Sequence, residues 1–334
     1  MTAGPTIDHA AILRLGLAPM LLLGWNVWMG DVLPFLGPSL LVPILLLNPL
    51  RPPLPLLGGM VVLVAALSAA LSIGFVALAD SPGSVWIALV ALATWCFARL
   101  DARPTDVPAL LALITASLVT ALLQASPLLA LELPWLMTAG ALQAVVCALI
   151  AHAVLPSRVA PPARRPPRVL PPGEAFSALV RGVALVAALG AAVVMQDTSA
   201  VLIAITAANI LRAPPDEAEG QGRALLLANL GAAALLLPVL ALTTMRPEAA
   251  VVMPLALAAS LWIASGLGAG GLRGAFTQVG MSVFIILTGT LLPQAGEGSL
   301  AAVADRVGTL ALTLAFALTV LALLHGRSGQ RRPA

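Results

Sequence analysis

Two short polar interruptions in an otherwise apolar chain carry residue types suited to binding a small anion. The segments "NPLRPP" and "NILRAPP" each place an Asn three positions before an Arg, and a proline pair follows. An Arg guanidinium can hold a carboxylate through two parallel hydrogen bonds, and an Asn side chain supplies both a donor and an acceptor. Both motifs end short or proline-interrupted apolar segments at corresponding positions of the two halves of the chain, which is the best sequence pointer to a substrate site. The leading candidates for substrate binding are therefore Asn48, Arg51, Asn209 and Arg212.

Other polar or aromatic residues inside apolar segments extend this candidate set. Arg14 and Arg181 lie about one turn inside such segments, where they either snorkel toward lipid headgroups or bind an anionic substrate. Asn26 either makes a hydrogen bond between helices or lines a substrate route. Trp95 and Trp262 belong either to an aromatic belt or to a stacking site for an aromatic substrate. Neutral polar residues with the same two interpretations as Asn26 are Gln124, Gln143, Asn229 and Gln278.

In each half of the chain, one Asp residue follows the first apolar segment. Asp31 and Asp197 occupy equivalent positions there. One interpretation is a solvated or helix-capping carboxylate. The other is a proton acceptor that couples transport to the proton gradient, because ionisable residues near membrane depth often form proton relays.

The motifs of most enzymes and metal proteins are missing from this sequence. The three His residues have no metal-ligand spacing with one another or with Cys or acidic residues. A G-x-x-x-x-G-K-[ST] phosphate loop is also absent. We therefore expect a protein that is not an enzyme and that carries no cofactor and no metal.

The composition indicates an integral membrane protein. Of the 334 residues, 60% are hydrophobic and 9% are charged, whereas an ordinary globular domain has about 25% charged residues. The apolar runs are continuous rather than alternating, which favours helices over a β-barrel. All seventeen basic residues are Arg, and most lie in short loops, so the basic balance does not indicate nucleic acid as a partner.

A membrane-spanning helix needs about 20 apolar residues, and this criterion gives twelve segments. They are 9–29, 33–50, 55–79, 84–100, 107–130, 134–155, 175–195, 198–212, 222–245, 249–268, 273–293 and 302–325. The sequence thus predicts membrane segments over 1–155 and 175–325, which are separated by a Pro/Arg-rich linker over 156–174 and followed by a basic tail over 326–334.

The distribution of Arg predicts the orientation of these helices. With the N-terminus in the cytoplasm, fifteen of the seventeen Arg residues fall on or near the cytoplasmic side, and only Arg246 and Arg306 do not. This bias follows the positive-inside rule and supports the count of twelve helices, with both termini cytoplasmic.

The two halves share an ordered set of features. Each has an Arg-bearing first segment, an Asp after it, a short second segment with the Asn/Arg/Pro motif, and a Trp in its fourth segment. Six helices per half let both halves enter the membrane from the same side. The predicted fold is an all-α polytopic membrane protein with about twelve transmembrane helices in two parallel six-helix repeats.

Residues 13–53 and 179–215 resemble the fusaric acid resistance and aromatic acid exporter superfamily. Its six-helix units begin with an Arg-bearing helix, continue with a short second helix that ends in a polar cytoplasmic turn, and are often duplicated. Larger members carry cytoplasmic domains that this chain lacks. The resemblance implies a component of the bacterial inner (cytoplasmic) membrane that exports small organic, especially aromatic, acids or toxic compounds together with a periplasmic membrane-fusion adaptor.

Two other functions fit the same residues. A membrane scaffold or assembly protein would need a filled core rather than a cavity lined by polar residues. Another kind of twelve-helix carrier, such as a major facilitator, would carry a Gly/Asp/Arg-rich loop between helices 2 and 3, where this chain has "NPLRPPLP".

Overall fold

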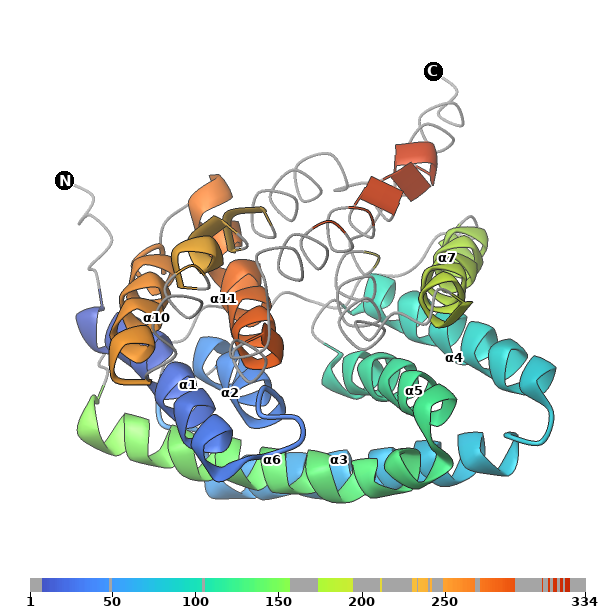
Figure 1. The fold of residues 1–334 in the computed structure, drawn as a ribbon, viewed down its shortest axis with the longest axis horizontal. Helices are drawn as coiled ribbons and strands as arrows, with labels where there is room; N and C mark the ends of the chain where they lie inside the picture. The colour runs from blue at the N-terminus through green and yellow to red at the C-terminus, as the bar shows by residue number, and fades with distance from the viewer. Residues whose placement is uncertain are drawn as a thin grey trace. The chain divides into compact units, whose positions relative to one another are not determined.

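Every regular element among the described residues of the computed structural model is a helix (Figure 1). The described residues are 8–47, 50–103, 106–156, 174–194, 211, 230–232, 234–239, 241, 249–267 and 271–291, with scattered positions between 308 and 324. Their helices are α1 (His9–Met29), α2 (Leu36–Leu47), α3 (Leu54–Ala77), α4 (Pro82–Ala102), α5 (Val107–Ala125), α6 (Pro127–Val154), α7 (Glu174–Val194), α10 (Ala249–Ala264) and α11 (Gly271–Leu291). The prediction of a helical chain is confirmed for these residues.

Six helices of the described part are long and apolar enough to cross a membrane, namely α1, α3, α4, α5, α6 and α7. Shorter apolar helical stretches lie at α2, at α10, at α11 and around 230–239. The chain thus has the helices of a multi-pass membrane protein, and the number of twelve spans stays a prediction. Most of the predicted segments 198–212, 222–245 and 302–325 lies outside the described residues, as do 157–173 of the linker and the tail 326–334.

The predicted helix boundaries agree best at α1 and worst between α5 and α6. The prediction over 9–29 matches α1. The sequence predicted helices over 107–130 and 134–155, whereas α5 ends at Ala125 and α6 already begins at Pro127. Proline is tolerated in the first helical turn, where its missing N–H has no partner to lose. Pro134, the predicted start of this helix, lies inside α6.

Side chains at the helix ends explain several of the other boundaries. The carboxylates of Asp8 and Asp106 accept hydrogen bonds from the backbone N–H groups of Ala11 and Ala109, so they cap the first turns of α1 and α5. At the other end of α1, Gly30 has φ +77°. Only glycine adopts this left-handed conformation without strain, and here it closes the helix.

The chain divides into two compact units, and each combines segments from before and after the linker. The first unit comprises Met1–Val61, Leu136–Ala163 and Ala224–Asp305, and the second comprises Val62–Trp135, Arg164–Arg223 and Arg306–Ala334. The first contains α1, α2, α10 and α11, the second contains α4, α5 and α7, and α3 and α6 contribute to both. The sequence predicts a division into two repeats, 1–155 and 175–325, and a repeat is a different property from a compact unit. That division stays a prediction.

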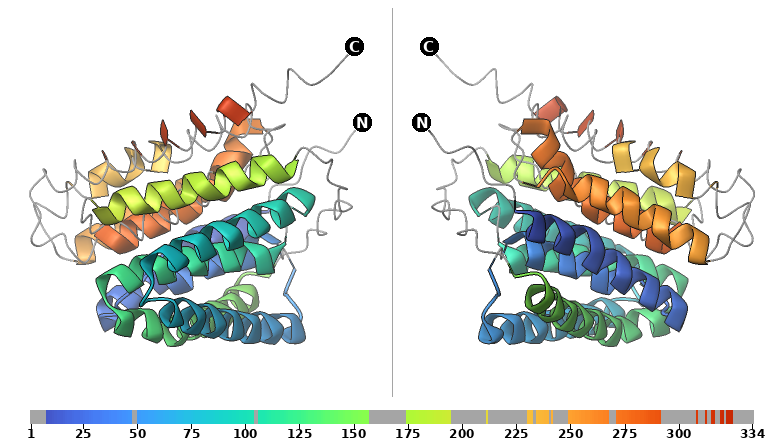
Figure 2. Two further views of the ribbon diagram at one scale, coloured as in Figure 1. Left: turned by 90° about the vertical axis from the view of Figure 1, so that its right-hand side faces the viewer. Right: turned by 90° about the vertical axis from the view of Figure 1, so that its left-hand side faces the viewer.

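In the first unit α10 packs along α1, and this pairing depends on a glycine (Figure 2, right, orange and dark blue). A Cβ atom on Gly16 would lie 2.7 Å from Cδ2 and 3.0 Å from Cα of Leu261. The Ser260 hydroxyl donates a hydrogen bond of 2.5 Å to the Gly16 carbonyl. Small residues let helices approach closely where lipid offers no hydrophobic driving force, so dispersion holds them together.

In the second unit α7 packs along α4 in the same manner (Figure 2, left, yellow-green and teal). A Cβ atom on Gly182 would lie 2.7 Å from Thr94 Oγ1, 3.1 Å from Thr94 N and 3.2 Å from the Val90 carbonyl oxygen. The helix α5 also packs against α4. The close approach at Gly182 brings its neighbour Arg181 against α4.

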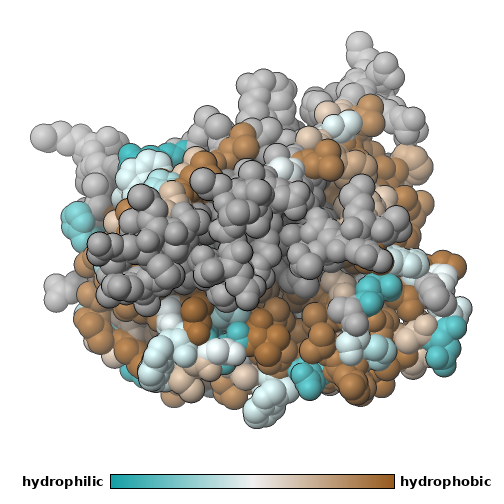
Figure 3. Space-filling view, viewed as in Figure 1, coloured by the Kyte–Doolittle hydropathy of each residue, from teal (hydrophilic) through white to brown (hydrophobic). Residues whose placement is uncertain are grey.

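Large apolar side chains are exposed on the described helices. Trp28 and Trp135 are each 74% exposed, and Ile87 is 72% exposed. Figure 3 shows hydrophobic side chains over much of the visible surface of the described residues. Apolar surface of this extent is unfavourable in water, and it is the surface expected of helices that face lipid.

Candidate functional site

The strongest departure from the apolar character of the second unit is a pair of opposite charges between α7 and α4. The side chains of Arg181 and Asp101 are 0% and 3% exposed. Nη1 of Arg181 donates to Asp101 Oδ1 at 3.0 Å, and Nη2 donates to Oδ2. The planar guanidinium therefore holds the carboxylate through two hydrogen bonds, the geometry in which Arg binds carboxylates best.

Three further groups surround the Arg181 guanidinium. Its Nε donates to the Ser177 carbonyl and its Nη1 donates to the Leu211 carbonyl, both at 3.3 Å. The Phe97 ring centroid lies 5.1 Å from its Cζ, which is within the range of a cation–π interaction. Asp101 neutralises the positive charge, and the two carbonyls and the ring replace the water that burial removes.

The Ser177 hydroxyl, one helical turn before Arg181, is an unused hydrogen-bond donor in the described part of the chain. Its Oγ is buried and has no hydrogen-bond partner in the described part of the chain. Ser177 precedes Arg181 by one helical turn, so the two residues lie on the same face of α7. An unpaired buried hydroxyl destabilises a protein by about 1–3 kcal/mol. The Ser177 hydroxyl could therefore donate a hydrogen bond to an additional group that enters the site.

A buried ion pair is weak evidence for stability, because desolvation of the two charges offsets most of their attraction. Charged residues inside membrane helices usually mark a pathway for an ion or a substrate. The groups gathered at Arg181 are a guanidinium, a free hydroxyl and an aromatic ring. These are the groups that bind an aromatic carboxylate, provided that Asp101 gives way.

Arg14 is the corresponding buried cation of the first unit. It is 2% exposed, and its Nη1 donates to the Leu155 carbonyl at 2.8 Å. Arg14 lies in the second turn of α1, and Leu155 directly follows α6. This hydrogen bond ties the beginning of α1 to the end of α6.

A cluster of polar side chains lies near the other end of α1. Asn26 is 1% exposed, and its Nδ2 donates to the Pro34 carbonyl at 3.1 Å and to Gln143 Oε1 at 3.0 Å. The Gln143 Nε2 group lies 3.5 Å from Asp31 Oδ2. The Asn26 Oδ1 atom is buried and has no hydrogen-bond partner among the described residues. This cluster links α1, the turn before α2 and α6.

Backbone geometry holds the members of this cluster in place. The Gly30 and Asp31 N–H groups donate to the Val27 and Asn26 carbonyls at 3.1 and 3.0 Å. This Schellman arrangement ends α1 and turns the chain toward α2. A Cβ atom on Gly37 would lie 3.2 Å from the backbone carbonyl oxygen of Gly140 and 2.8 Å from Gln143 Oε1, so the absence of a side chain there favours the close approach of α2 to α6.

Asn26→Leu is expected to destabilise the chain by about 1 kcal/mol, because it removes two hydrogen bonds between membrane helices and leaves the Pro34 carbonyl without this donor. The measurement is the thermal unfolding midpoint of the detergent-solubilised chain. Gln124→Leu on α5 is the matched control, since Gln124 is exposed and should tolerate the change. Equal shifts in the two variants would contradict a structural role for the Asn26 cluster.

The two tryptophans of the predicted set, on α4 and α10, point outward from their units. Trp95 is 51% exposed and lies under the Arg99 guanidinium, whose Cζ is 5.9 Å from the ring centroid. Trp262 is 57% exposed and contacts Phe276 edge-on at 5.8 Å between centroids. The described ring contacts of the two tryptophans are therefore with Arg99 and Phe276.

The remaining predicted site residues are exposed or outside the described part. Arg51 is exposed before α3, and Asp31 is exposed after α1. Gln278 lies on α11, but its side chain is outside the description. The residues Asn48, Asp197, Asn209, Arg212 and Asn229 also lie outside the described residues. Of the predicted set, the structure therefore brings together Asn26, Asp31 and Gln143.

Asp101 and Ser177 were missed by the sequence analysis. The predicted helix over 84–100 ends one residue before Asp101, which lies between Arg99 and Arg103 in the sequence. The helix continues to Ala102, so Asp101 faces α7 while Arg99 is exposed. The available signal was its position one turn after Phe97, on the same helical face.

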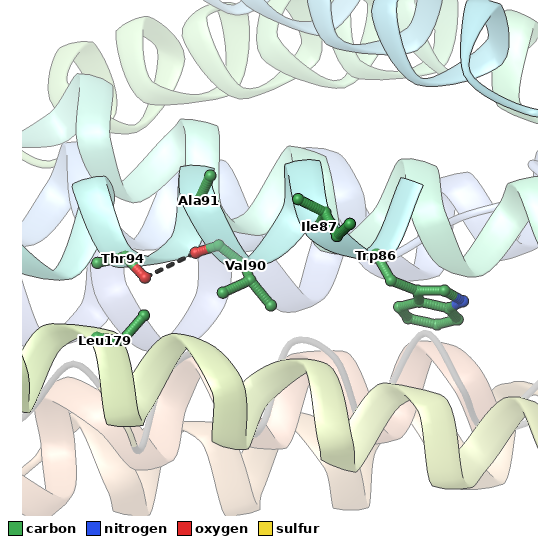
Figure 4. A pocket seen from close by; sticks show the side chains of 6 residues that line it. All are labelled: Trp86, Ile87, Val90, Ala91, Thr94 and Leu179. Carbon is green, nitrogen blue, oxygen red and sulfur yellow. Dashed lines mark hydrogen bonds between the residues drawn. The ribbon is translucent and has the colours of Figure 1, made fainter. Parts of the chain in front are cut away.

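An apolar groove of about 430 Å³ lies along α4 beside α7 (Figure 4). Its lining residues are Trp86, Ile87, Val90, Ala91, Thr94 and Leu179. The Thr94 hydroxyl already donates to the Val90 carbonyl at 2.7 Å. The groove thus suits an apolar group such as a lipid chain, and its side chains offer no charge to hold a carboxylate.

Within the described residues, no group of three or more His, Cys, Asp or Glu side chains is arranged to hold a metal ion. Comparison of the chain with protein-family models, with curated proteins and with solved structures finds no match.

Proposed function

We propose that this chain is a secondary transporter of the bacterial inner membrane that exports small organic anions and is driven by the proton gradient. The observation that carries this proposal is the complete burial of two guanidinium groups, Arg14 and Arg181, in helices apolar enough to cross a membrane. Buried cations in membrane helices are costly and usually serve a transported ion or substrate. A guanidinium favours an anion, and carboxylate fits its geometry.

The proposed architecture is twelve transmembrane helices in two parallel six-helix repeats. Two helix pairings support it. The first helix of the N-terminal half, α1, packs on α10, and the first helix of the C-terminal half, α7, packs on α4. In a repeat, α10 and α4 are equivalent fourth helices, so the two pairings are equivalent as well. A glycine close to the buried Arg makes the contact in both, Gly16 in α1 and Gly182 in α7.

The proposed orientation has both termini in the cytoplasm. Within each unit, groups expected on the cytoplasmic side lie together. Arg14 reaches the carbonyl of Leu155, and Arg181 reaches Asp101. These contacts support the depth of the helices that was inferred from the Arg distribution.

The substrate class and the partner come from the resemblance to the fusaric acid resistance and aromatic acid exporter superfamily. On this basis the substrates are aromatic acids or related toxic compounds, and a periplasmic membrane-fusion adaptor completes the export route. Asp31 and Asp197 are the proposed proton acceptors. The cluster of Asp31 with Gln143 and Asn26 supports the first of these, because it links an exposed carboxylate to a buried polar group.

A membrane scaffold is the rival function. The two hydrogen bonds between Arg181 and Asp101 favour the scaffold, because an ion pair whose two members already bind each other can be a purely structural contact. A scaffold would move no substrate, so transport measurements separate the two functions.

Expression of the chain in an efflux-deficient bacterial host is expected to raise resistance to aromatic acids, and Asp31→Asn and Asp197→Asn are each expected to abolish the gain by removing a proton acceptor. The measurement is the inhibitory concentration for a panel of aromatic acids, with protein abundance checked by immunoblotting. Asp80→Asn is the control, because Asp80 is an exposed carboxylate after α3.

Each result bears on one part of the proposal. Resistance that persists in both Asp31→Asn and Asp197→Asn would rule out proton coupling through these residues. A wild-type chain that gives no resistance, and no efflux of labelled acids, would favour the scaffold.

A further inference from the structure

We infer that Asp101 is an internal competitor for the substrate: its carboxylate occupies Arg181 in the empty transporter and is displaced when the carboxylate of an organic acid binds. This inference rests on the proposed transport function and names the residue pair at which the anion binds.

The geometry of the pair supports this competition. Asp101 is held by Nη1 and Nη2 of Arg181, and a substrate carboxylate would need the same two donors. Of its other N–H groups, that of Nε is directed to the Ser177 carbonyl and a second one on Nη1 to the Leu211 carbonyl. Because the guanidinium can hold one carboxylate in this two-pronged manner at a time, Asp101 and the substrate exclude each other.

The net charge of the site explains the role of Asp101 in the empty transporter. With Asp101 in place the buried site is neutral, so the empty protein can rearrange without carrying a buried cation through the membrane. Without Asp101 the empty site keeps an uncompensated guanidinium, which is strongly unfavourable in a buried position. With an anion bound the guanidinium is neutralised again, even when Asp101 is absent; in the wild type the displaced Asp101 carboxylate then has to reach water or take up a proton, because it too is unfavourable when buried without a partner.

Ser177 supplies the donor that a second carboxylate needs. Its buried Oγ has no hydrogen-bond partner in the described part of the chain while the Arg181–Asp101 pair is closed. It lies one turn from Arg181 on the same face of α7. The hydroxyl therefore gains a partner when an additional carboxylate enters, which offsets part of the cost of displacing Asp101.

Two other charged residues near the end of α4, Arg99 and Asp106, pair with each other. Arg99 pairs with Asp106 through its Nη2 at 2.9 Å, and this Arg is 48% exposed. The second carboxylate oxygen of Asp106 caps α5 through the Ala109 N–H. Asp106 is therefore committed to α5 and Arg99, and the buried competitor is Asp101.

The test uses the purified full chain in phosphatidylethanolamine/phosphatidylglycerol liposomes loaded with radiolabelled hippurate, an aromatic carboxylate that crosses lipid slowly. Exchange is measured with unlabelled hippurate outside, and net efflux is measured without it. Exchange needs only the loaded transporter to rearrange, whereas net efflux also needs the empty one. The variants are Asp101→Asn, Asp101→Glu, Arg181→Gln and Ser177→Ala.

Asp101→Asn is expected to retain exchange, at a lower half-saturating hippurate concentration, and to lose net efflux by about tenfold or more, because only the empty form carries an unpaired buried charge. Hippurate should also raise the unfolding temperature of Asp101→Asn more than that of the wild type. Asp101→Glu keeps both activities, and Arg181→Gln loses both. Ser177→Ala raises the half-saturating concentration by about tenfold, because it removes one hydrogen bond to a charged group.

Equal loss of exchange and net efflux in Asp101→Asn would overturn the inference and leave the pair a structural contact. If Asp101→Asn does not fold, Ser177→Ala decides, because its hydroxyl has no partner to lose; an unchanged half-saturating concentration overturns the inference. A wild-type chain that shows neither exchange nor net efflux of hippurate and of other aromatic acids contradicts the proposed function itself. If transport occurs but Asp101 does not compete with the substrate, the wild type still transports hippurate, so the two failures can be distinguished.

Discussion

Asp101→Leu is expected to destabilise the chain by about 3–5 kcal/mol, the usual cost of removing one partner of a buried ion pair. The substitution leaves the Arg181 guanidinium buried, with the Ser177 and Leu211 carbonyls as hydrogen-bond acceptors but without a carboxylate. Carbonyl dipoles replace only part of the interaction with a full negative charge. The measurement is unfolding of the purified chain by titration with sodium dodecyl sulfate in mixed micelles.

Two further variants separate the pair from a general effect of substitution. Asp101→Leu combined with Arg181→Met should recover most of the lost stability, because two apolar side chains replace two buried charges. Arg99→Gln is the matched control in α4: it breaks the partly exposed pair with Asp106, which contributes about 0–1 kcal/mol. An Asp101→Leu variant as stable as Arg99→Gln would show that the buried pair is not required for folding.

The positions of the apolar helices could be predicted from the sequence because each requires only a long apolar run bounded by polar residues or prolines. The prediction for α1 matches its bounds, and α3, α4 and α7 end within a few residues of theirs. The prediction of helix bounds is least accurate at α5 and α6, because a proline can lie either at the start of a helix or inside it. Pro127 begins a helix, while Pro134 lies within one, and the residue type alone does not distinguish the two.

The helix pairings could not be predicted in the same manner. Helices in lipid are apolar on all sides, so no hydrophobic stripe identifies the packing face. The contacts of α1 with α10 and of α7 with α4 instead depend on the absence of a side chain at Gly16 and Gly182. Glycine is frequent in this sequence, and only the structure distinguishes those that permit a close approach.

The candidate site was predicted in part. Arg14, Asn26 and Arg181 were identified because polar side chains within apolar segments are rare and costly. Their partners were harder to recognise. Asp101 lies 80 positions from Arg181, and the predicted helix over 84–100 ends one residue before it. Gln143 was identified as a polar residue at membrane depth, but its contact with Asn26 follows from the packing of α6 near α1.

Gly182→Leu is expected to destabilise the chain by about 3 kcal/mol, at the upper end of the usual cost of overpacking. The first added carbon would lie 2.7 Å from Thr94 Oγ1 and 3.1 Å from the Thr94 backbone nitrogen. The hydroxyl can rotate away, but the backbone of α4 cannot, so α7 must move outward and carry Arg181 with it. The measurement combines the unfolding midpoint with hippurate exchange, and both are expected to decrease.

Alanine substitutions on α7 provide the control, because Gly190 lies on the same helix with nothing within 4 Å of its Cβ position. Gly190→Ala should therefore stabilise the chain by about 0.5–1 kcal/mol, since alanine restricts the unfolded chain and favours the helix. Gly182→Ala should instead destabilise it by about 1–3 kcal/mol, because the gain in helix propensity is smaller than the cost of the close contact. Opposite signs for the same substitution, two turns apart, are the result expected if the approach of α7 to α4 at Gly182 positions the buried pair. The same sign at both positions would contradict that approach.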